Sequence, residues 1–341
     1  MPRVVCDDRG FVVEPGANLL DALLRAGLKV ASSCRAGACQ ACLVQATRGT
    51  PPVAAQAGLK ATQRDQRYFL ACQARVTEDL ELSLDGARAL TIASEVESNE
   101  RLAPDVVKVV LRLEAPLPYR AGQYVTLVRA DGLARAYSIA NPSANPAAGS
   151  TRLELHVRVL ENGRMSTWLA RPETLGARLA LRGPVGECCY IPGKPDQPLL
   201  LAGTGTGLAP LWGVLHEALA AGHRGPIELW HGARTAEGLY LMRELEALAR
   251  AHPQLRYRRC VLQGAAGADA GIDIGSLDAV LLASTHSFAG RRVFLCGDPT
   301  LVQQLKRKVF LLGASLPEIF VDAFVGTYVG TSVGTAPPAP P

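Results

Sequence analysis

The N-terminal part of the chain alternates between short strand-like runs and one amphipathic helical segment. Leucines at positions 19, 20, 23 and 24 share one face of a helix over Leu19–Ala26, with Asn18 as the expected N-cap and Gly27 as the stop. Runs rich in apolar and β-branched residues predict strands, and the first two form a hairpin. These runs are Arg3–Asp7, Phe11–Glu14, Leu43–Ala46 and Leu80–Leu84. Two hairpins around one helix predict a small domain over residues 1–86.

The pattern after residue 86 consists of many short strands with turn signals between them. The predicted strands are Ala89–Glu97, Val106–Leu113, Gly122–Val128 and Leu153–Leu160, with a turn at Gly183–Gly186. Such spacing is typical of a small barrel. We expect this domain to cover residues 87–194, and the Gly/Pro-rich run Pro192–Pro198 to be a linker.

From Pro198 onward, apolar strand-like runs alternate with segments of helical period. The predicted strands are Leu199–Ala202, Ile227–His231, Leu255–Val261 and Arg292–Cys296, and the predicted helices follow Gly207 and cover Leu239–Ala251 and Pro299–Leu312. This alternation predicts a parallel α/β domain over residues 195–325. A threefold Val-Gly-Thr repeat and a Pro/Ala run predict a disordered tail at 326–341.

Composition restricts the class of protein. The chain has 341 residues, enough for two or three domains, and 48% of them are hydrophobic. The net charge of +5 includes no dense basic tract, so nothing supports nucleic-acid binding. No apolar run approaches the ~18–20 residues that span a bilayer. Charged residues lie where a signal peptide would be apolar. We expect a monomer that does not bind membranes, and the odd number of remaining cysteines, treated below, favours the cytoplasm.

Four of the nine cysteines follow a ligand spacing. Cys34, Cys39 and Cys42 are spaced C-x4-C-x2-C, and Cys72 lies far downstream. This is the plant-type spacing for a [2Fe–2S] cluster held by four thiolates. Small residues between the ligands, including Gly37, would let backbone N–H groups approach the cluster sulfurs. The alternatives are a structural zinc site, although zinc ribbons usually pair two C-x2-C knuckles, and unrelated buried thiols.

The five other cysteines are expected to be reduced thiols, because an odd remainder does not form a closed set of disulfides. Cys188 and Cys189 are neighbours in the chain, and neighbouring strand residues point to opposite faces, so joint chelation is not expected. Cys6 and Cys260 lie in apolar strands and are expected to be packed there.

The run Gly203-Thr-Gly205-Thr206-Gly207 lies between a predicted strand and a predicted helix. Glycines in this position let backbone N–H groups reach a pyrophosphate, and the helix start adds partial positive charge. The run is not the strict Rossmann fingerprint, because Leu208 occupies the place of the third glycine. A simple tight turn is therefore the alternative.

Four motifs in order give one resemblance. They are Arg-x-Tyr-Ser at Arg135–Ser138, Gly-x-Met-Ser at Gly163–Ser166, Gly-Thr-Gly-x-Gly-x-x-Pro from Gly203 to Pro210 and Cys-Gly-Asp-Pro at Cys296–Pro299. In these four motifs, which occur in the expected order, the chain resembles the ferredoxin–NADP reductase superfamily. With a ferredoxin-like domain in front, the chain resembles the reductase components of bacterial multicomponent oxygenases, such as the phenol hydroxylase and methane monooxygenase reductases. The resemblance implies a multidomain α+β and α/β protein: a β-grasp ferredoxin domain, an antiparallel flavin-binding β-barrel and a parallel α/β nicotinamide-binding domain.

The resemblance also implies roles for single residues of the flavin domain. Arg135 would bind the flavin pyrophosphate, Tyr137 would lie against the isoalloxazine ring, and Ser138 would face flavin N5. A phosphate of FAD would be held at a helix start by Gly163, Met165, Ser166 and Thr167. The alternative for Arg135 and Tyr137 is a surface arginine and a barrel-core tyrosine.

In the nicotinamide domain, the resemblance implies binding by Gly203, Gly205, Thr206 and Gly207. Cys296 would lie near the nicotinamide carbon that releases hydride, or else be a small buried hydrophobe. Asp322 and Phe324 match the acidic and aromatic residues that screen the flavin in this family. Arg234 could meet the 2′-phosphate of NADPH, and Glu237 the ribose hydroxyls of NADH. We favour NADH because most oxygenase reductases use it.

The implied function follows from electron counts. Nicotinamide releases two electrons as hydride, a [2Fe–2S] cluster carries one, and FAD can accept a pair and release electrons singly. The expected order is therefore NAD(P)H, FAD, [2Fe–2S], and then a protein acceptor, with the hydroxylase of an oxygenase favoured. The alternatives are another acceptor, such as a sugar-deoxygenating dehydratase, or an iron–sulfur sensor or carrier without turnover.

Overall fold

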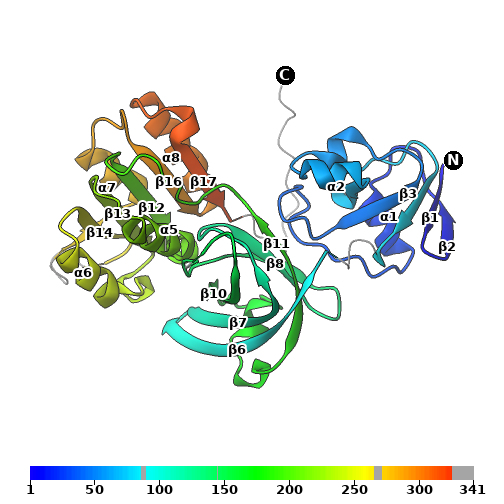
Figure 1. The fold of residues 1–341 in the computed structure, drawn as a ribbon, viewed down its shortest axis with the longest axis horizontal. Coiled ribbons are helices and arrows are strands. Elements are labelled where there is room, and N and C mark those ends of the chain that lie inside the picture. Colours follow the sequence, from blue (N-terminus) through cyan, green and yellow to red (C-terminus); the bar gives the residue numbers. More distant parts are fainter. Residues whose placement is uncertain (86–89, 144, 265–270, 325–341) are drawn as a thin grey trace.

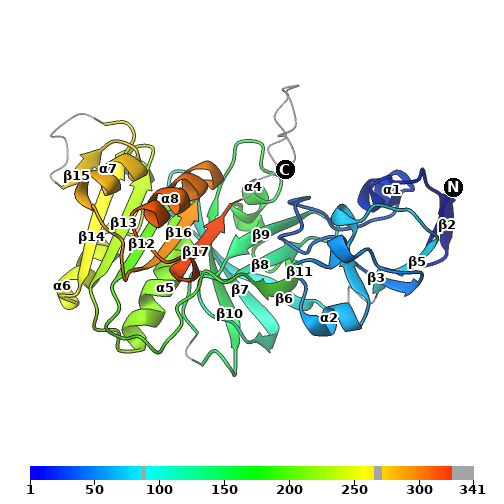
Figure 2. The same ribbon diagram turned by 90° about the horizontal axis from the view of Figure 1, so that it is seen from above.

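The computed structural model describes residues 1–85, 90–143, 145–264 and 271–324, which form three β-sheets. Figures 1 and 2 show the N-terminal unit at one end, a barrel in the middle, and a parallel sheet with its helices at the other end. The predicted tail at 326–341 lies outside the described residues. No described helix is long and apolar enough to cross a bilayer.

The N-terminal unit is a five-stranded mixed sheet with a helix packed into its core. Its strands are β1 (Arg3–Cys6), β2 (Arg9–Val12), β3 (Leu43–Arg48), β4 (Tyr68–Leu70) and β5 (Leu80–Ser83), in the order β2-β1-β5-β3-β4. β1 pairs antiparallel with β2, as the predicted hairpin requires, and parallel with β5. Its helices are α1 (Leu19–Arg25), α2 (Ala61–Asp65) and the 3-10 turns η1 (Val53–Gln56) and η2 (Ala71–Gln73).

Helix α1 begins where the sequence predicts and connects to the last cysteine. The Asn18 side chain accepts a hydrogen bond from the Asp21 N–H at 3.2 Å, which caps the helix. Its amide also donates to the Cys72 carbonyl at 2.8 Å. The same cap therefore fixes the distant segment that carries Cys72.

The middle unit is a six-stranded antiparallel barrel. Its strands are β6 (Ile92–Ala103), β7 (Val106–Leu117), β8 (Tyr124–Val128), β9 (Ala134–Ser138), β10 (Ser150–Arg158) and β11 (Arg178–Val185), in the order β10-β7-β6-β11-β8-β9. A bridge between Ile139 and Leu155 joins the two edges. Two short helical turns follow β10, namely α4 (Ser166–Leu169) and η3 (Pro172–Thr174).

The predicted turn at Gly183–Gly186 is wrong in its extent. Strand β11 continues through Gly183 and Pro184 to Val185, and its pairing with β8 shifts register between Arg182 and Val185. Gly183 has a φ of 132°. The Gly-Pro pattern that predicted a turn therefore corresponds to an irregularity within the strand. Pairing with β8 keeps the segment in the sheet despite that signal.

The C-terminal unit is a parallel six-stranded sheet with helices, as predicted. Its strands are β12 (Leu199–Thr204), β13 (Ile227–Ala233), β14 (Leu255–Val261), β15 (Ile272–Ile274), β16 (Arg292–Gly297) and β17 (Ile319–Ala323). Its helices are α5 (Leu208–Ala220), α6 (Met242–Ala251), α7 (Leu277–Ser284) and α8 (Pro299–Leu311), with 3-10 turns η4 (Gly205–Gly207), η5 (Ala236–Gly238) and η6 (Leu316–Glu318). The sequence predicts neither β15, α7 nor β17, which are short or weakly patterned.

Helix α5 lies between the parallel sheet and the barrel and is buried on most of its circumference (Figure 1). A Cβ on Gly213 would lie 2.5 Å from the Cβ of Ala121, so only glycine allows this approach. The Glu217 carboxylate accepts a hydrogen bond from the Ala121 N–H at 2.8 Å. One hydrophobic cluster includes both Val106 of the barrel and Leu211 of α5. The barrel and the parallel sheet therefore share part of a core.

Candidate functional site

The four predicted ligand cysteines come together around the segment Cys34–Cys42, called here the cysteine loop. The Cys34 sulfur accepts hydrogen bonds from the N–H groups of Ala36 and Cys39, each at 3.4 Å. The Cys42 sulfur accepts one from the Cys72 N–H at 3.4 Å. A cluster bound by thiolates is stabilised by such donors.

The loop wraps tightly because several of its residues adopt positive φ. These residues are Arg35 at 54°, Gly37 at 80° and Gln40 at 53°. A Cβ on Gly37 would lie 3.2 Å from the Gln73 side chain, so glycine is favoured there by both φ and space.

The four thiols form two pairs, Cys34 with Cys39 and Cys42 with Cys72. A hydrogen bond within each pair lowers the pKa of Cys34 to about 5 and that of Cys72 to about 6. The same bonds raise the pKa of Cys39 and Cys42. Among the described residues, no group of three or more Cys, His, Asp or Glu side chains could hold a single metal ion. Two pairs of thiols fit a centre that contains two irons.

The cysteine loop packs directly against the barrel. Cys39 is 5% exposed and lies in a small apolar cluster with Ala41 and with Ala134 of β9. Ser32, just before the loop, forms a parallel bridge with Leu133. Cys34 and Cys72 are partly exposed, so the set of cysteines faces the barrel on one side and solvent on the other.

The glycine run lies where the order of the parallel sheet reverses. The sheet order is β15-β14-β13-β12-β16-β17, so the chain leaves β12 toward one edge and returns at β16 toward the other. In open α/β sheets, ligands bind at the carboxyl ends of the two strands beside such a reversal. Gly203–Gly207 and Cys296–Gly297 lie at these ends.

The glycines have two different roles there. A Cβ on Gly207 would lie 2.4 Å from the Cys296 carbonyl oxygen, and one on Gly203 would lie 2.9 Å from the Gly207 carbonyl oxygen, so both permit close packing. Gly205 has a φ of 54°, and no atom lies within 4 Å of the position that a Cβ would take there. Thr206 between them is buried. The open side of Gly205 leaves space for a ligand beside the N-terminal end of α5.

The three predicted catalytic residues meet between the barrel and the parallel sheet. Ser138, at the end of β9, donates a hydrogen bond from its hydroxyl to Asp322 Oδ2 at 2.6 Å. Asp322 is the register partner of Cys296 on the neighbouring strand. Burial raises the pKa of Asp322 to about 6, against the opposing effect of the Ser138 bond. The Phe324 N–H donates to the Gly297 carbonyl at 2.8 Å, which fixes the next residues of that segment.

The predicted flavin-binding residues lie on β9 and on the turn before α4. Tyr137 packs partly buried against the barrel core, and Arg135 is partly buried beside it. The Gly163 carbonyl accepts hydrogen bonds from the hydroxyls of Ser166 at 3.2 Å and Thr167 at 2.7 Å. These bonds close the turn at the start of α4.

The Met165 side chain does not line this turn. It is 1% exposed and belongs to the barrel core. Its side chain is therefore not available to contact a cofactor.

Comparison with known families gives three matches in the order of the three units. Residues 4–77 match the 2Fe-2S iron-sulfur cluster binding domain, residues 93–190 the oxidoreductase FAD-binding domain, and residues 201–307 the oxidoreductase NAD-binding domain.

Relatives and solved structures extend this likeness to nearly the whole chain. The ferredoxin–NAD(P)(+) reductase component of the naphthalene 1,2-dioxygenase system of Pseudomonas putida is 31% identical over 90% of this chain and 93% of its own. The reductase subunit of an aromatic O-demethylase of Amycolatopsis is 34% identical over 85% of this chain and 88% of its own. The crystal structure of an Amycolatopsis cytochrome P450 reductase has a TM-score of 0.65 at 30% identity, covering 95% of this chain and 99% of that one.

The chain belongs to the family of oxygenase reductase components. The reductase is thus an NAD(P)H-dependent flavin and iron–sulfur oxidoreductase, with a [2Fe–2S] cluster, FAD and NAD(P)H as its cofactors. The predicted cofactors and fold class are confirmed. The residues present fit these groups: paired thiols with N–H donors for the cluster, and an open glycine at the reversal of the sheet for the dinucleotide.

Sequence reasoning missed one partner in this site. Cys188 lies with its sulfur 3.4 Å from that of Cys296, and both thiols are buried. In the sequence, Cys188 is notable only as the neighbour of Cys189, and these two cysteines are not expected to bind a metal together. Cys6 and Cys260 are buried, as predicted.

Arg234 and Glu237 lie just beyond β13, near the same end of the sheet, and both are exposed. A hydrogen bond from the Thr235 side chain lowers the pKa of Glu237. Their positions are compatible with either dinucleotide, so the preference for NADH stays a prediction.

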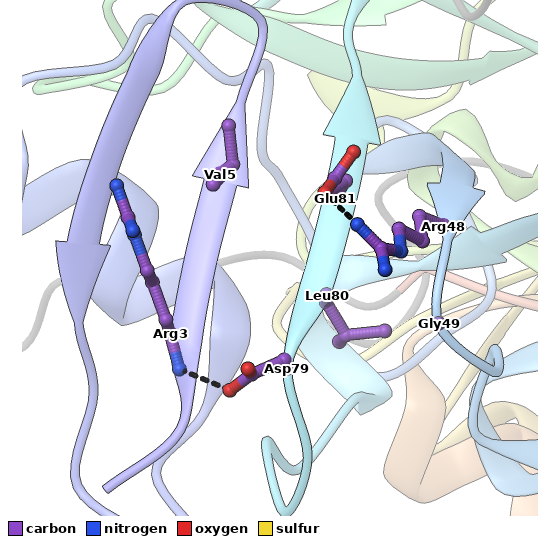
Figure 3. A pocket seen from close by; sticks show the side chains of 7 residues that line it. All are labelled: Arg3, Val5, Arg48, Gly49, Asp79, Leu80 and Glu81. Carbon is purple, nitrogen blue, oxygen red and sulfur yellow. Dashed lines mark hydrogen bonds and ion pairs between the residues drawn. The ribbon is translucent and has the colours of Figure 1, made fainter.

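A separate cavity of about 470 Å³ lies in the ferredoxin unit of the reductase, at the end of β3 away from the cysteine loop (Figure 3). The Arg3 N–H donates to Asp79 Oδ1 at 2.7 Å, and Arg48 pairs with Glu81 at 3.4 Å. The first bond comes from the main chain of Arg3, and the Arg48–Glu81 pair is exposed to solvent. None of the predicted site residues lines it.

Proposed function

We propose that this reductase transfers electrons from NADH, through FAD and the [2Fe–2S] cluster, to the oxygenase component of a bacterial multicomponent oxygenase. The observation that supports it most is the position of the cysteine loop. Cys39 is buried against the barrel, whereas Cys34 and Cys72 remain partly exposed. Electrons can therefore enter the cluster from the flavin side and leave it toward a docked protein.

When bound, nicotinamide supplies hydride, the flavin divides its electron pair, and the cluster carries single electrons. The chain's own residues provide the geometry. The main chain of Gly203–Gly207 receives the dinucleotide, and Thr206 lies within this run. Ser138, Asp322 and Cys296 would lie around the place where hydride passes. Phe324, whose main chain is bound to Gly297, would cover its outer side.

On the flavin side, Arg135 would neutralise pyrophosphate charge and Tyr137 would support the ring. Gly163, Ser166 and Thr167 would hold a phosphate through the turn before α4. Cys34, Cys39, Cys42 and Cys72 would ligate the cluster, one pair of thiolates to each iron.

The proposal includes three domains with the bounds 1–86, 87–194 and 195–325. It also includes that the protein is a monomer and lies in the cytoplasm. None of the nine cysteines forms a disulfide within the described residues, which suits a reducing compartment. NADH is favoured over NADPH. The exposed Arg234 is the residue that would bind a 2′-phosphate if that preference is reversed.

A second acceptor class has a specific observation in its favour. The Amycolatopsis structure that is similar over 95% of this chain is a cytochrome P450 reductase. A cytochrome P450 is then the alternative acceptor to a non-haem oxygenase. A P450 gene beside the gene for this reductase would favour that alternative.

An anaerobic titration of the purified protein tests the proposal. We expect about one FAD, two irons and two sulfides per chain. Stoichiometric NADH should bleach the flavin and then produce the electron paramagnetic resonance (EPR) signal of a reduced cluster, and NADPH should do so more slowly. Cys39→Ser should abolish the EPR signal but keep flavin reduction. Zinc in place of iron, or no oxidation of NADH with any acceptor, would contradict the proposal.

A further inference from the structure

The side chain of Arg182 reaches from the barrel into the cysteine loop. Arg182 lies on β11 and is 8% exposed. Its Nη1 donates hydrogen bonds to the carbonyl oxygens of both Gln40 and Ala41, each at 2.9 Å. These two residues lie between the ligands Cys39 and Cys42 in the sequence. A buried cation from the barrel thus binds the main chain that carries the cluster ligands.

Two neighbouring side chains of the barrel bind the preceding carbonyls of the loop. The Tyr124 hydroxyl donates to the Ala38 carbonyl at 2.8 Å, and the Thr126 hydroxyl donates to the Cys39 carbonyl at 2.6 Å. Thr126 is the register partner of Arg182 across β8 and β11. Four consecutive carbonyls of the loop are therefore held by one pair of strands.

These bonds fix the direction of the N–H groups as well. In a planar trans peptide, the carbonyl and the following N–H point in opposite directions. Arg182 binds the Gln40 carbonyl, and the N–H of the same peptide unit, on Ala41, donates to the Cys39 sulfur. Tyr124 binds the Ala38 carbonyl, and the Cys39 N–H donates to the Cys34 sulfur. The barrel thereby aims peptide dipoles at the ligand sulfurs.

The charge of Arg182 acts in the same direction. Burial lowers the pKa of its guanidinium, and attraction by Cys42 and Cys39 opposes this effect. An arginine remains charged at physiological pH even so. A cluster gains one negative charge when it is reduced, and a nearby cation of low solvent exposure favours that state.

We propose that Arg182 is a positioning residue for electron transfer from flavin to cluster. It holds the cysteine loop on the barrel through two carbonyls, and its charge raises the reduction potential of the cluster, so that the cluster accepts electrons from the flavin. This inference rests on the proposed ligation by the four cysteines.

Three variants of the full-length holoprotein separate charge from packing. Arg182→Met removes the charge and both hydrogen bonds, and Arg182→Lys retains the charge. Thr126→Val removes a neighbouring carbonyl bond at nearly constant volume, with no change in charge. The readouts are the midpoint potential of the cluster, from a redox titration followed by EPR, and the stopped-flow rates of flavin and cluster reduction.

We expect Arg182→Met to lower the equilibrium constant for cluster reduction about tenfold, which is 59 mV for one electron. Cluster reduction should slow, while flavin reduction by NADH is unchanged. Arg182→Lys and Thr126→Val should keep a potential close to that of the wild type.

An unchanged potential in Arg182→Met would overturn the inference, and so would an equal shift in Thr126→Val, since that would assign the effect to packing. If Arg182→Met does not fold, Arg182→Gln replaces it. If neither folds while Thr126→Val does, Arg182 has a structural role only and the inference fails. A wild-type protein without iron or EPR signal would instead refute the cluster site itself.

Discussion

Asp322 is the residue of the hydride site whose protonation state changes closest to neutral pH. Burial raises its pKa to about 6, and the Ser138 hydroxyl donates to it at 2.6 Å. Cys296 on the neighbouring strand and Tyr124 of β8 also act on this site, and burial raises the pKa of both above their ordinary values. Neither of them therefore titrates near pH 6.

We predict that flavin reduction by NADH slows as the pH rises through about 6. Below this pH the protonated Asp322 can donate to Ser138, which leaves the Ser138 proton free for the flavin. Above it, the ionised Asp322 carboxylate accepts a hydrogen bond from the Ser138 hydroxyl, which keeps that proton away from the flavin. Loss of one hydrogen bond of about 1 kcal/mol corresponds to about a fivefold change in rate. Stopped-flow measurement across the pH range should show a flat profile for Asp322→Asn. A wild-type step near pH 6 that persists in the variant would contradict this assignment.

At the scale of elements, strands β16 and β17 are held together by a charged junction at their base. Arg292 Nε donates to Glu318 Oε2 at 2.6 Å, and Lys194 Nζ donates to Oε1 at 2.7 Å. Arg292 also donates to the Ile191 carbonyl at 2.8 Å and is 7% exposed. The junction connects the linker between barrel and sheet to the strands that carry Cys296 and Asp322.

We predict that Glu318→Gln destabilises the C-terminal unit by about 3 kcal/mol, because it leaves a buried guanidinium without its carboxylate. The bond from Arg292 lowers the pKa of Glu318 to about 2. A folded-state pKa below the ordinary 4.5 gives stability that is present above about pH 4.5 and is lost as the pH falls through about 2.

Urea unfolding at several pH values measures this prediction. The difference from wild type should be constant near neutral pH and shrink toward pH 3. Asp196→Asn is the matched control, because the ion pair of Asp196 with Arg224 is exposed and contributes little. Equal stabilities of wild type and Glu318→Gln at pH 7 would refute the role of the junction.

At the scale of the whole molecule, the three units are joined unequally. The ferredoxin unit has its own core, and a small apolar cluster with Cys39, Ala41 and Ala134 connects it to the barrel. The barrel and the parallel sheet share a larger cluster through helix α5. Removal of the ferredoxin unit should therefore leave the other two intact.

We predict that a chain beginning at Leu90 folds, binds FAD and oxidises NADH with ferricyanide, which takes electrons from the flavin. It should lose most reduction of cytochrome c and all delivery to the native acceptor, because both depend on the cluster. Steady-state assays with each acceptor test this, with residues 1–85 alone as the control that keeps a cluster but oxidises no NADH. Turnover of the native acceptor by the truncated chain would show that the cluster is not the exit for electrons.

The local patterns predicted the elements that depend on local physics. Asn18 caps α1, and Gly203–Gly207 lies between a strand and a helix. Leu19, Leu20 and Leu23 of that helix are buried, but Leu24, predicted on the same apolar face, is exposed. Cysteine spacing indicated the cluster, because ligand spacing is a property of the chain itself. Local patterns did not predict the short strands β15 and β17, nor the continuation of β11 through the expected turn at Gly183–Gly186. Pairing with other strands determines these segments.

The sequence by itself determined the three units, their order and the cofactor classes, because periodicity and motif spacing are written along the chain. The tertiary structure alone decided which distant groups meet. Ser138 and Asp322 are 184 residues apart, Cys188 and Cys296 are 108 apart, and Arg182 and Gln40 are 142 apart. Each of these contacts crosses an interface between units. No local preference encodes it, because it exists only once separate sheets have packed against one another and excluded water from between them.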